Sequence, residues 1–181
     1  MNGSIYLSYI NKHLPGWYHE VLPRLSLCLP VPIIPLECDI DLELFYTRER
    51  NQYHSTLILA QLLKSLPGEN SKILGITGVD LFLPVLTFVF GEAQFNGKGA
   101  LVSTYRLRNE FYGLPASEEL FVERVVKEAL HELGHTFGLT HCADYRCVMN
   151  SSTYVEDIDL KESRYCPVCR DSIGATCTRI E

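Results

Sequence analysis

The sequence lacks the long apolar runs and targeting features that would place it in a membrane or a secretory pathway. No stretch reaches the roughly 18 apolar residues of a membrane-spanning helix. An apolar segment at residues 25–36 is short and is broken by three prolines. The N-terminal residues lack a basic start followed by an apolar core, so they do not resemble a signal peptide. We therefore expect a cytoplasmic protein with no membrane partner.

An excess of positive charge is also absent. The chain has 16 Lys and Arg residues against 22 Asp and Glu residues, a formal net charge of -6, and it contains no run of basic side chains. This balance argues against nucleic acid as a partner, because proteins that bind nucleic acid present basic surfaces. Internal repeats and low-complexity tracts are missing too, and 181 residues suffice for one compact core. A monomer is the simplest expectation.

The apolar pattern of the first three quarters of the chain predicts an α/β layer. We expect strands at residues 4–10, 31–36 and 72–79, helices at residues 14–27 and 51–66, and a hairpin of residues 87–95 and 100–107. Ser117 is suited to cap the N-terminus of a long helix that follows it. After Gly138 the sequence becomes polar and rich in cysteine. We therefore predict an N-terminal subdomain at residues 1–138 and a small C-terminal subdomain at residues 139–181.

Half of the six histidines lie in one short segment, HELGHTFGLTH. His131 and His135 are four residues apart and would share one face of a helix, where both can bind one zinc ion. Glu132 lies next to the first ligand and could act as a general base on a water molecule whose pKa zinc lowers to about 7. Two histidines at this spacing also occur by chance on surface helices, so the pair alone is a modest signal.

A catalytic zinc site needs a third protein ligand and one open position. Gly138 can adopt the left-handed conformation that ends a helix and turns the chain. His141, three residues later, could then return to the metal, which it would not reach if the helix continued. The complete set of three histidines, one glutamate and one glycine is far more specific than the pair alone.

Four of the seven cysteines form two closely spaced pairs, Cys142 with Cys147 and Cys166 with Cys169. Four thiolates in two such pairs suit a tetrahedral structural zinc, and a small subdomain with few large apolar residues needs a cross-link of this kind. Two disulfides or an iron–sulfur cluster are the alternatives. The other three cysteines are read as small buried hydrophobic residues or idle thiols, outside the metal shell: Cys28, Cys38 and Cys177.

The histidine segment resembles HExxHxxGxxH, the pattern of metzincin metallopeptidases. Followed by the four cysteines and Met149, it is similar to the archaemetzincin family, over about the last quarter of the chain. The resemblance implies an α+β or α/β fold with a metzincin-like twisted mixed β-sheet, two long helices and a small zinc-stapled C-terminal subdomain. It also implies that Met149 packs beneath the zinc ligands. Ser151 stands where some clan members carry an additional tyrosine ligand.

The resulting hypothesis is a zinc metallopeptidase with two zinc ions per chain and a peptide or protein substrate. The segment at residues 88–95 is our candidate for the sheet edge that would receive an extended peptide. A zinc-stabilised protein-binding module with a latent or inactive three-histidine site is the alternative. The intact Glu132 favours the enzyme, because a purely structural site needs no such carboxylate. A nucleic-acid-binding zinc ribbon is disfavoured by the acidic charge.

Overall fold

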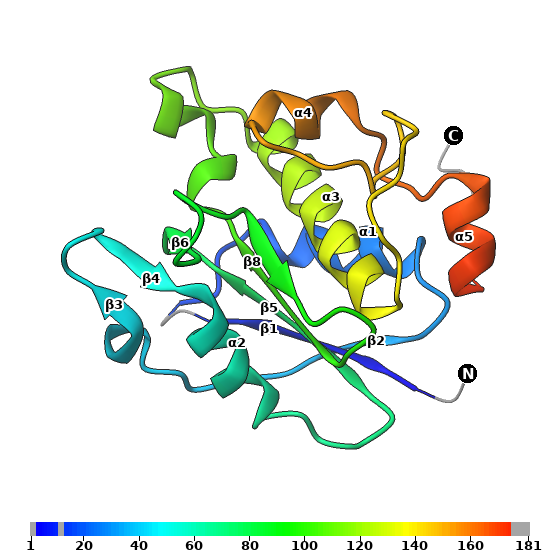
Figure 1. Ribbon diagram of the computed structural model, residues 1–181, viewed down its shortest axis with the longest axis horizontal. Helices are drawn as coiled ribbons and strands as arrows, with labels where there is room; N and C mark the ends of the chain where they lie inside the picture. The colour runs from blue at the N-terminus through cyan, green and yellow to red at the C-terminus, as the bar shows by residue number, and fades with distance from the viewer. Residues whose placement is uncertain (1–2, 11–12, 175–181) are drawn as a thin grey trace.

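The protein is described by a computed structural model in which residues 3–10 and 13–174 are placed, so that Cys177 lies outside the described residues (Figure 1). Its centre is a five-stranded sheet with the order β2-β1-β5-β8-β7. The first four strands are mutually parallel, and β7 is antiparallel to β8. Their bounds are β1 (Ile5–Tyr9), β2 (Ile33–Pro35), β5 (Lys72–Thr77), β7 (Gly91–Ala93) and β8 (Gly99–Ser103).

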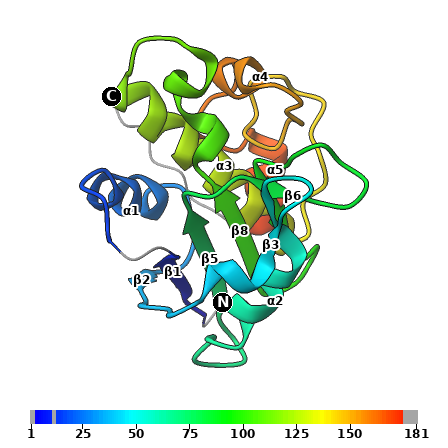
Figure 2. The ribbon, with the colours of Figure 1, turned by 90° about the vertical axis from the view of Figure 1, so that its left-hand side faces the viewer.

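Helices cover both faces of this sheet. Side chains of successive strand residues point to opposite faces, so Leu74 and Ile76 join one buried cluster while Ile73 joins the other. The first cluster includes α1 (Tyr18–Ser26) and α3 (Glu118–Thr136), and the second includes α2 (Ser55–Leu63). Figure 2 shows α3 above the strands and α2 below them.

Most of the predicted elements are confirmed. The strands of the central sheet match the predicted segments to within one residue, the hairpin turns at residues 94–98, and the Ser117 hydroxyl accepts a hydrogen bond from the Leu120 N–H at the start of α3. The mixed α/β fold class is confirmed as well. Of the two long helices that the resemblance implies, one is present among the described residues: α3 has 19 residues, whereas α1 and α2 have nine each.

The helix predicted at residues 51–66 was wrong at its N-terminal end. Asn51 has a φ of 53°, a left-handed conformation that cannot begin a right-handed helix. The next residues form a strand of a second sheet with the order β3-β4-β6. Gln52 is buried there and hydrogen-bonds Asp80, a tertiary contact that local periodicity does not reveal. The bounds are β3 (Tyr46–Thr47), β4 (Gln52–His54) and β6 (Leu81–Phe82).

The C-terminal segment contains only short helices, α4 (Val155–Leu160) and α5 (Pro167–Ile173). Its apolar side chains Val148, Met149 and Ile158 belong to the same buried cluster as the side chains of α3. The segment therefore packs on the long helix through a continuous core, and a subdomain boundary at residue 138 stays a prediction. Three 3-10 turns complete the described elements: Leu42–Phe45, Tyr105–Leu107 and Asn109–Tyr112. None of the described helices is long and apolar enough to cross a membrane.

Candidate metal centres and active site

The long helix α3 presents His131 and His135 toward one point, as the spacing predicts. The Nδ1 atom of His131 lies 2.8 Å from the Val148 carbonyl oxygen, and Nδ1 of His135 lies 2.8 Å from that of Leu139. Because a carbonyl oxygen can only accept, each Nδ1 carries the proton and donates it. Both Nε2 lone pairs are therefore left for a metal ion, with the ring orientations held by the backbone.

The geometry of the three histidines fits a single metal ion. The Nε2 atoms of His131 and His135 are 3.1 Å apart. Two nitrogens bound at about 2.1 Å to one tetrahedral metal lie about 3.4 Å apart, so little movement is needed. Gly138 has a φ of 87° and ends the helix, which confirms the predicted turn. His141 thereby joins the cluster, and the ligand atoms of the three residues all lie within 4.8 Å of one another.

The protonation of these histidines also suits metal binding. Burial lowers the pKa of His131 to about 3, with the nearby Lys161 ammonium adding to the shift. The pKa values of His135 and His141 are lowered as well, mainly by burial. A metal ligand must be the neutral imidazole. Near neutral pH all three rings are in that form.

Glu132 lies between the histidine cluster and the edge strand β7. A Cβ atom added to Gly91 of β7 would lie 2.6 Å from Cγ and 2.7 Å from Oε1 of Glu132. The carboxylate therefore packs directly on the backbone of the edge strand, and a larger residue at position 91 would force the Glu132 side chain to shift. Burial raises the pKa of Glu132 well above its ordinary value, and the carboxylates of Glu128 and Glu92 raise it further. Burial and the two neighbouring carboxylates therefore make the protonated form of Glu132 easier to reach than it is for an exposed glutamate.

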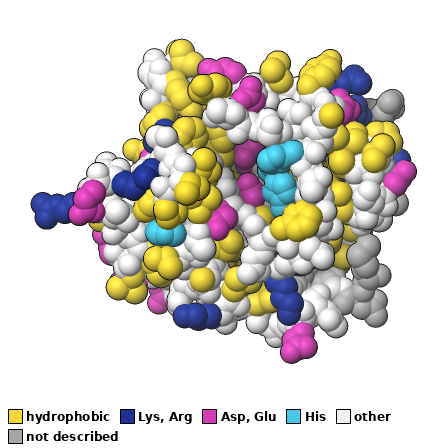
Figure 3. All heavy atoms as spheres, in the orientation of Figure 1, with side chains coloured by type: hydrophobic (Ala, Val, Ile, Leu, Met, Phe, Trp, Pro, Cys, Tyr) yellow, Lys and Arg dark blue, Asp and Glu magenta, His cyan; other side chains and the backbone are white. Residues whose placement is uncertain are grey.

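The edge strand β7 is open to a partner. Among the described residues β7 is the last strand of its sheet, but Val89 just before it forms an isolated bridge with Leu81 of β6, so the edge predicted for residues 88–95 is open only along the three residues of β7. Glu92 on this strand accepts hydrogen bonds from the hydroxyls of Ser55 and Thr56 at the start of α2. These bonds tie the strand to α2. Figure 3 shows histidine side chains beside acidic side chains in a recess near the middle of this face.

Met149 is buried against the helix that carries the first two histidines, as the resemblance implies. A Cβ atom at Gly134 would lie 2.3 Å from the Met149 Sδ atom, so this position accepts no larger residue without a shift. The Met149 carbonyl oxygen also accepts a hydrogen bond of 2.9 Å from the Cys142 N–H. The methionine thereby links the helix to the residue that follows the third histidine.

The four cysteines predicted to form a second metal site are brought together. Their sulfur atoms all lie within 4.8 Å of one another. The Sγ atoms of Cys142 and Cys166 are 3.8 Å apart, which is about the separation of two thiolates bound at 2.3 Å to a tetrahedral zinc ion. None of the described cysteines is joined in a disulfide, which removes that alternative for these four residues. The donor set and its closed geometry fit a structural zinc ion.

A buried ion pair beside the active site was missed by the sequence analysis. Lys161 Nζ lies 3.9 Å from Glu128 Oε1, and both side chains are almost fully buried. Neither of these two atoms has a hydrogen-bond partner among the described residues. Burial raises the pKa of Glu128 to about 7, a rise that Lys161 limits. Only the position of Glu128, four residues before Glu132 on the same helix face, could have indicated it in the sequence.

Comparison with known proteins agrees with this arrangement. The model of peptidase family M54 matches residues 29–174. The archaemetzincin of Methanocaldococcus jannaschii is 50% identical over 131 residues, which are 72% of this chain and 71% of that one.

Solved structures are similar over nearly the whole chain. The crystal structure of the archaemetzincin of Methanopyrus kandleri has a TM-score of 0.81 at 35% identity and covers 94% of this chain and 93% of that one. A zinc-dependent peptidase from Methanocorpusculum labreanum has a TM-score of 0.81 at 30% identity and covers 93% and 99%, respectively. The match of the family model over most of the chain, together with the histidine triad and the four-cysteine cluster, shows that this chain belongs to the archaemetzincins, the metallopeptidases of family M54.

Proposed function

We propose that the chain is a zinc-dependent peptidase that uses Glu132 as its general base and general acid. In this proposal His131, His135 and His141 hold a catalytic zinc ion, and the four clustered cysteines hold a structural one. The substrate is a peptide or an extended segment of a protein. The observation that carries the proposal is the close approach of the Glu132 carboxylate to Gly91 of the edge strand β7. Glu132 directly follows His131, so this carboxylate adjoins both the three-histidine cluster and the strand edge.

Each of these residues has a task in peptide hydrolysis. A zinc ion, when bound, polarises the peptide carbonyl and makes a water molecule more acidic. Glu132 accepts a proton from the attacking water and then delivers it to the leaving amine. The unpaired backbone groups of β7 can hydrogen-bond an extended peptide and hold its scissile bond over Glu132. His131 and His135 keep their orientation through the carbonyl contacts of Val148 and Leu139.

The proposal is tested by replacing Glu132 and a matched glutamate on the same helix. Glu132→Gln should lower the rate of cleavage of a broad peptide library by at least about 100-fold, the usual contribution of a general base. Glu119→Gln, at the exposed start of α3, should leave the rate unchanged. Metal analysis of all three proteins should give two zinc ions per chain.

Two results would contradict the proposal. Equal cleavage by the wild type and the Glu132→Gln variant would favour the binding module with an inactive histidine site. A metal content of one zinc ion or none would defeat the two-site assignment.

A further inference from the structure

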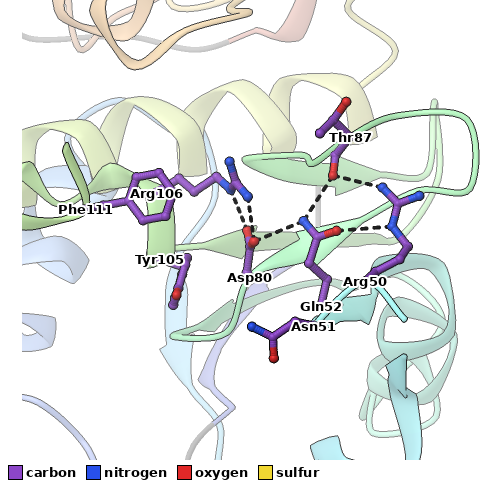
Figure 4. A pocket seen from close by; sticks show the side chains of 8 residues that line it. All are labelled: Arg50, Asn51, Gln52, Asp80, Thr87, Tyr105, Arg106 and Phe111. Carbon is purple, nitrogen blue, oxygen red and sulfur yellow. Dashed lines mark hydrogen bonds and ion pairs between the residues drawn. The ribbon is translucent and has the colours of Figure 1, made fainter. Parts of the chain in front are cut away.

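A cavity close to the start of the edge strand is separate from both metal sites. Its volume is about 460 Å³, and it is lined mainly by polar side chains (Figure 4). These come from separate segments, namely the turn before β4, the loop after β5, the loop before β7 and the turn after β8. The lining residues used below are Arg50, Gln52, Asp80, Thr87 and Arg106. We call this cavity the Arg50 pocket.

Arg106 is held in the pocket by an ion pair with the buried Asp80. Asp80 accepts hydrogen bonds of 2.7 Å from both Nε and Nη2 of Arg106, a bidentate pair. Asp80 also accepts a hydrogen bond of 3.0 Å from the amide of Gln52, and both residues are buried. The guanidinium of Arg106 lies 4.2 Å from the ring centre of Phe88. The negative charge of Asp80 is thus already matched by Arg106.

Arg50, in contrast, is held by neutral groups only. Its Nε donates to the side-chain oxygen of Gln52, and its Nη2 donates to the carbonyl oxygens of Leu86 and Thr87. The guanidinium also lies 4.4 Å from the centre of the Phe82 ring. In the part of the chain that the structure describes, no carboxylate forms an ion pair with Arg50 and its Nη1 has no hydrogen-bond partner. The arginine is thus fixed in place while its charge is left for an outside anion.

The charge of the pocket favours a singly charged anion. Two guanidinium groups and one carboxylate leave an excess of one positive charge, in a chain whose formal net charge is -6. Figure 4 shows Arg106 and Arg50 on opposite sides of Gln52 and Asp80, so an anion above these two buried residues can meet both cations. A carboxylate has the matching charge and a planar shape that suits guanidinium N–H groups.

The pocket lies within reach of the active site along the edge strand. Thr87 lines the pocket, and Gly91, which packs on Glu132, follows four residues later. Four residues span at most about 14 Å when fully extended. A peptide paired with β7 advances about 3.3 Å per residue, and it must leave the strand edge before Val89, whose N–H donates to the Leu81 carbonyl oxygen of β6. A group in the pocket would therefore belong to a residue three to five positions from the scissile bond.

We propose that the Arg50 pocket is a specificity subsite that binds a carboxylate of the peptide substrate, with Arg50 as the residue that recognises it. The inference rests on the proposed peptidase function. The carboxylate can belong to an Asp or Glu side chain or to the C-terminus of the peptide. An acidic residue or a free C-terminus three to five positions from the cleaved bond then favours cleavage.

Matched peptides and variants test this proposal. Peptides with Glu or Gln at each of those positions, and with a free or an amidated C-terminus, distinguish the two sources of the carboxylate. The wild type should cleave the acidic member of at least one pair about tenfold faster in kcat/KM, mainly through KM, and added salt should reduce that preference.

Three arginine variants sharpen the test. Arg50→Met should lose the preference, so that the acidic and neutral members of each pair are cleaved at equal rates. Arg50→Lys should keep part of the preference. Arg48→Met, an exposed arginine of the same turn outside the pocket, should keep all of it. The salt dependence of the wild type needs no variant, so the proposal is testable even if Arg50→Met proves unstable.

Failure of this inference can be told apart from failure of the proposed function. Equal cleavage of acidic and neutral peptides by an active wild type, with an inactive Glu132→Gln variant, overturns the subsite alone. If no peptide is cleaved, calorimetric titration of the wild type with the same peptides decides the point. Tighter binding of acidic peptides that is lost in Arg50→Met supports the pocket, and equal binding overturns it.

Discussion

The three-histidine cluster and the four-cysteine cluster adjoin at His141 and Cys142 but are built in different ways. Two of the histidines come from one turn of a 19-residue helix that packs against the central sheet. The cysteines come from loops and short helices, in a segment whose longest described helix has seven residues. Regular structure therefore positions the histidines, whereas the cysteines lie in a segment with little regular structure, which is held by apolar packing on α3 and by the cysteine cluster itself.

This difference explains why the two clusters suit different roles. The histidine cluster is partly open, because His141 is exposed and the edge strand β7 leaves room beside it. The cysteine cluster is closed, because all four positions of a tetrahedral ion would be occupied by sulfur. An open site can admit a substrate, and a closed site can only stabilise. Four substitutions test this division, in order of expected effect.

The largest effect is expected from the cysteine cluster. Cys166→Ser should lower the stability by on the order of 5 kcal/mol, because a structural metal in a small unit contributes folding energy directly. For a chain of this size the Tm would fall by more than about 10 °C. His141→Ala should cost roughly 1 kcal/mol, since the side chain is exposed. Thermal unfolding with metal analysis checks both, and the opposite order would break the comparison.

The next effect is expected from the buried ion pair that joins the two regions. Lys161→Met leaves the buried carboxylate of Glu128 without its cation and should cost about 3 kcal/mol. The double variant Lys161→Met with Glu128→Gln should recover more than half of that loss, because neither member of the pair is then charged. Urea unfolding of the two single variants and the double variant measures the coupling. Additive effects would show that the pair does not act as a unit.

A smaller effect is expected where the methionine meets the helix. Gly134→Ala places a methyl group against the Met149 sulfur and should cost about 2 kcal/mol by overpacking. Gly16→Ala is the matched control, because no atom lies within 4 Å of its added Cβ. Adding Met149→Leu to Gly134→Ala changes the shape at the contact and should alter the cost, if the contact is its cause. The same stability for both glycine variants would disprove the steric explanation.

The smallest effect is expected at the far end of the long helix. Ser117→Ala removes the N-cap hydrogen bond to the Leu120 N–H and should cost about 1 kcal/mol. The affinity of the histidine cluster for zinc should not change, because the sheet holds the ligand-bearing turn in place. Calorimetric unfolding and a competitive zinc titration give the two values. A parallel drop in zinc affinity would indicate that the cluster depends on the whole helix.

Local sequence determined the chemistry of both clusters, because their ligands are close together along the chain. The spacing of His131, His135 and His141 and the left-handed turn at Gly138 are short-range features, so the triad was predicted before the fold was known. The cysteine pairs were predicted for the same reason. The N-cap at Ser117 and the hairpin likewise depend on neighbouring residues only.

Only the tertiary structure decided what surrounds these ligands. Gly91 meets Glu132, and Lys161 meets Glu128, across segments that are distant in sequence. The short strand β4 replaced part of a predicted helix because Gln52 is drawn into a buried contact with Asp80. The same contact positions Arg50, whose charge faces a pocket that no sequence pattern indicated. Such contacts depend on how the whole chain packs, and short-range periodicity carries no information about them.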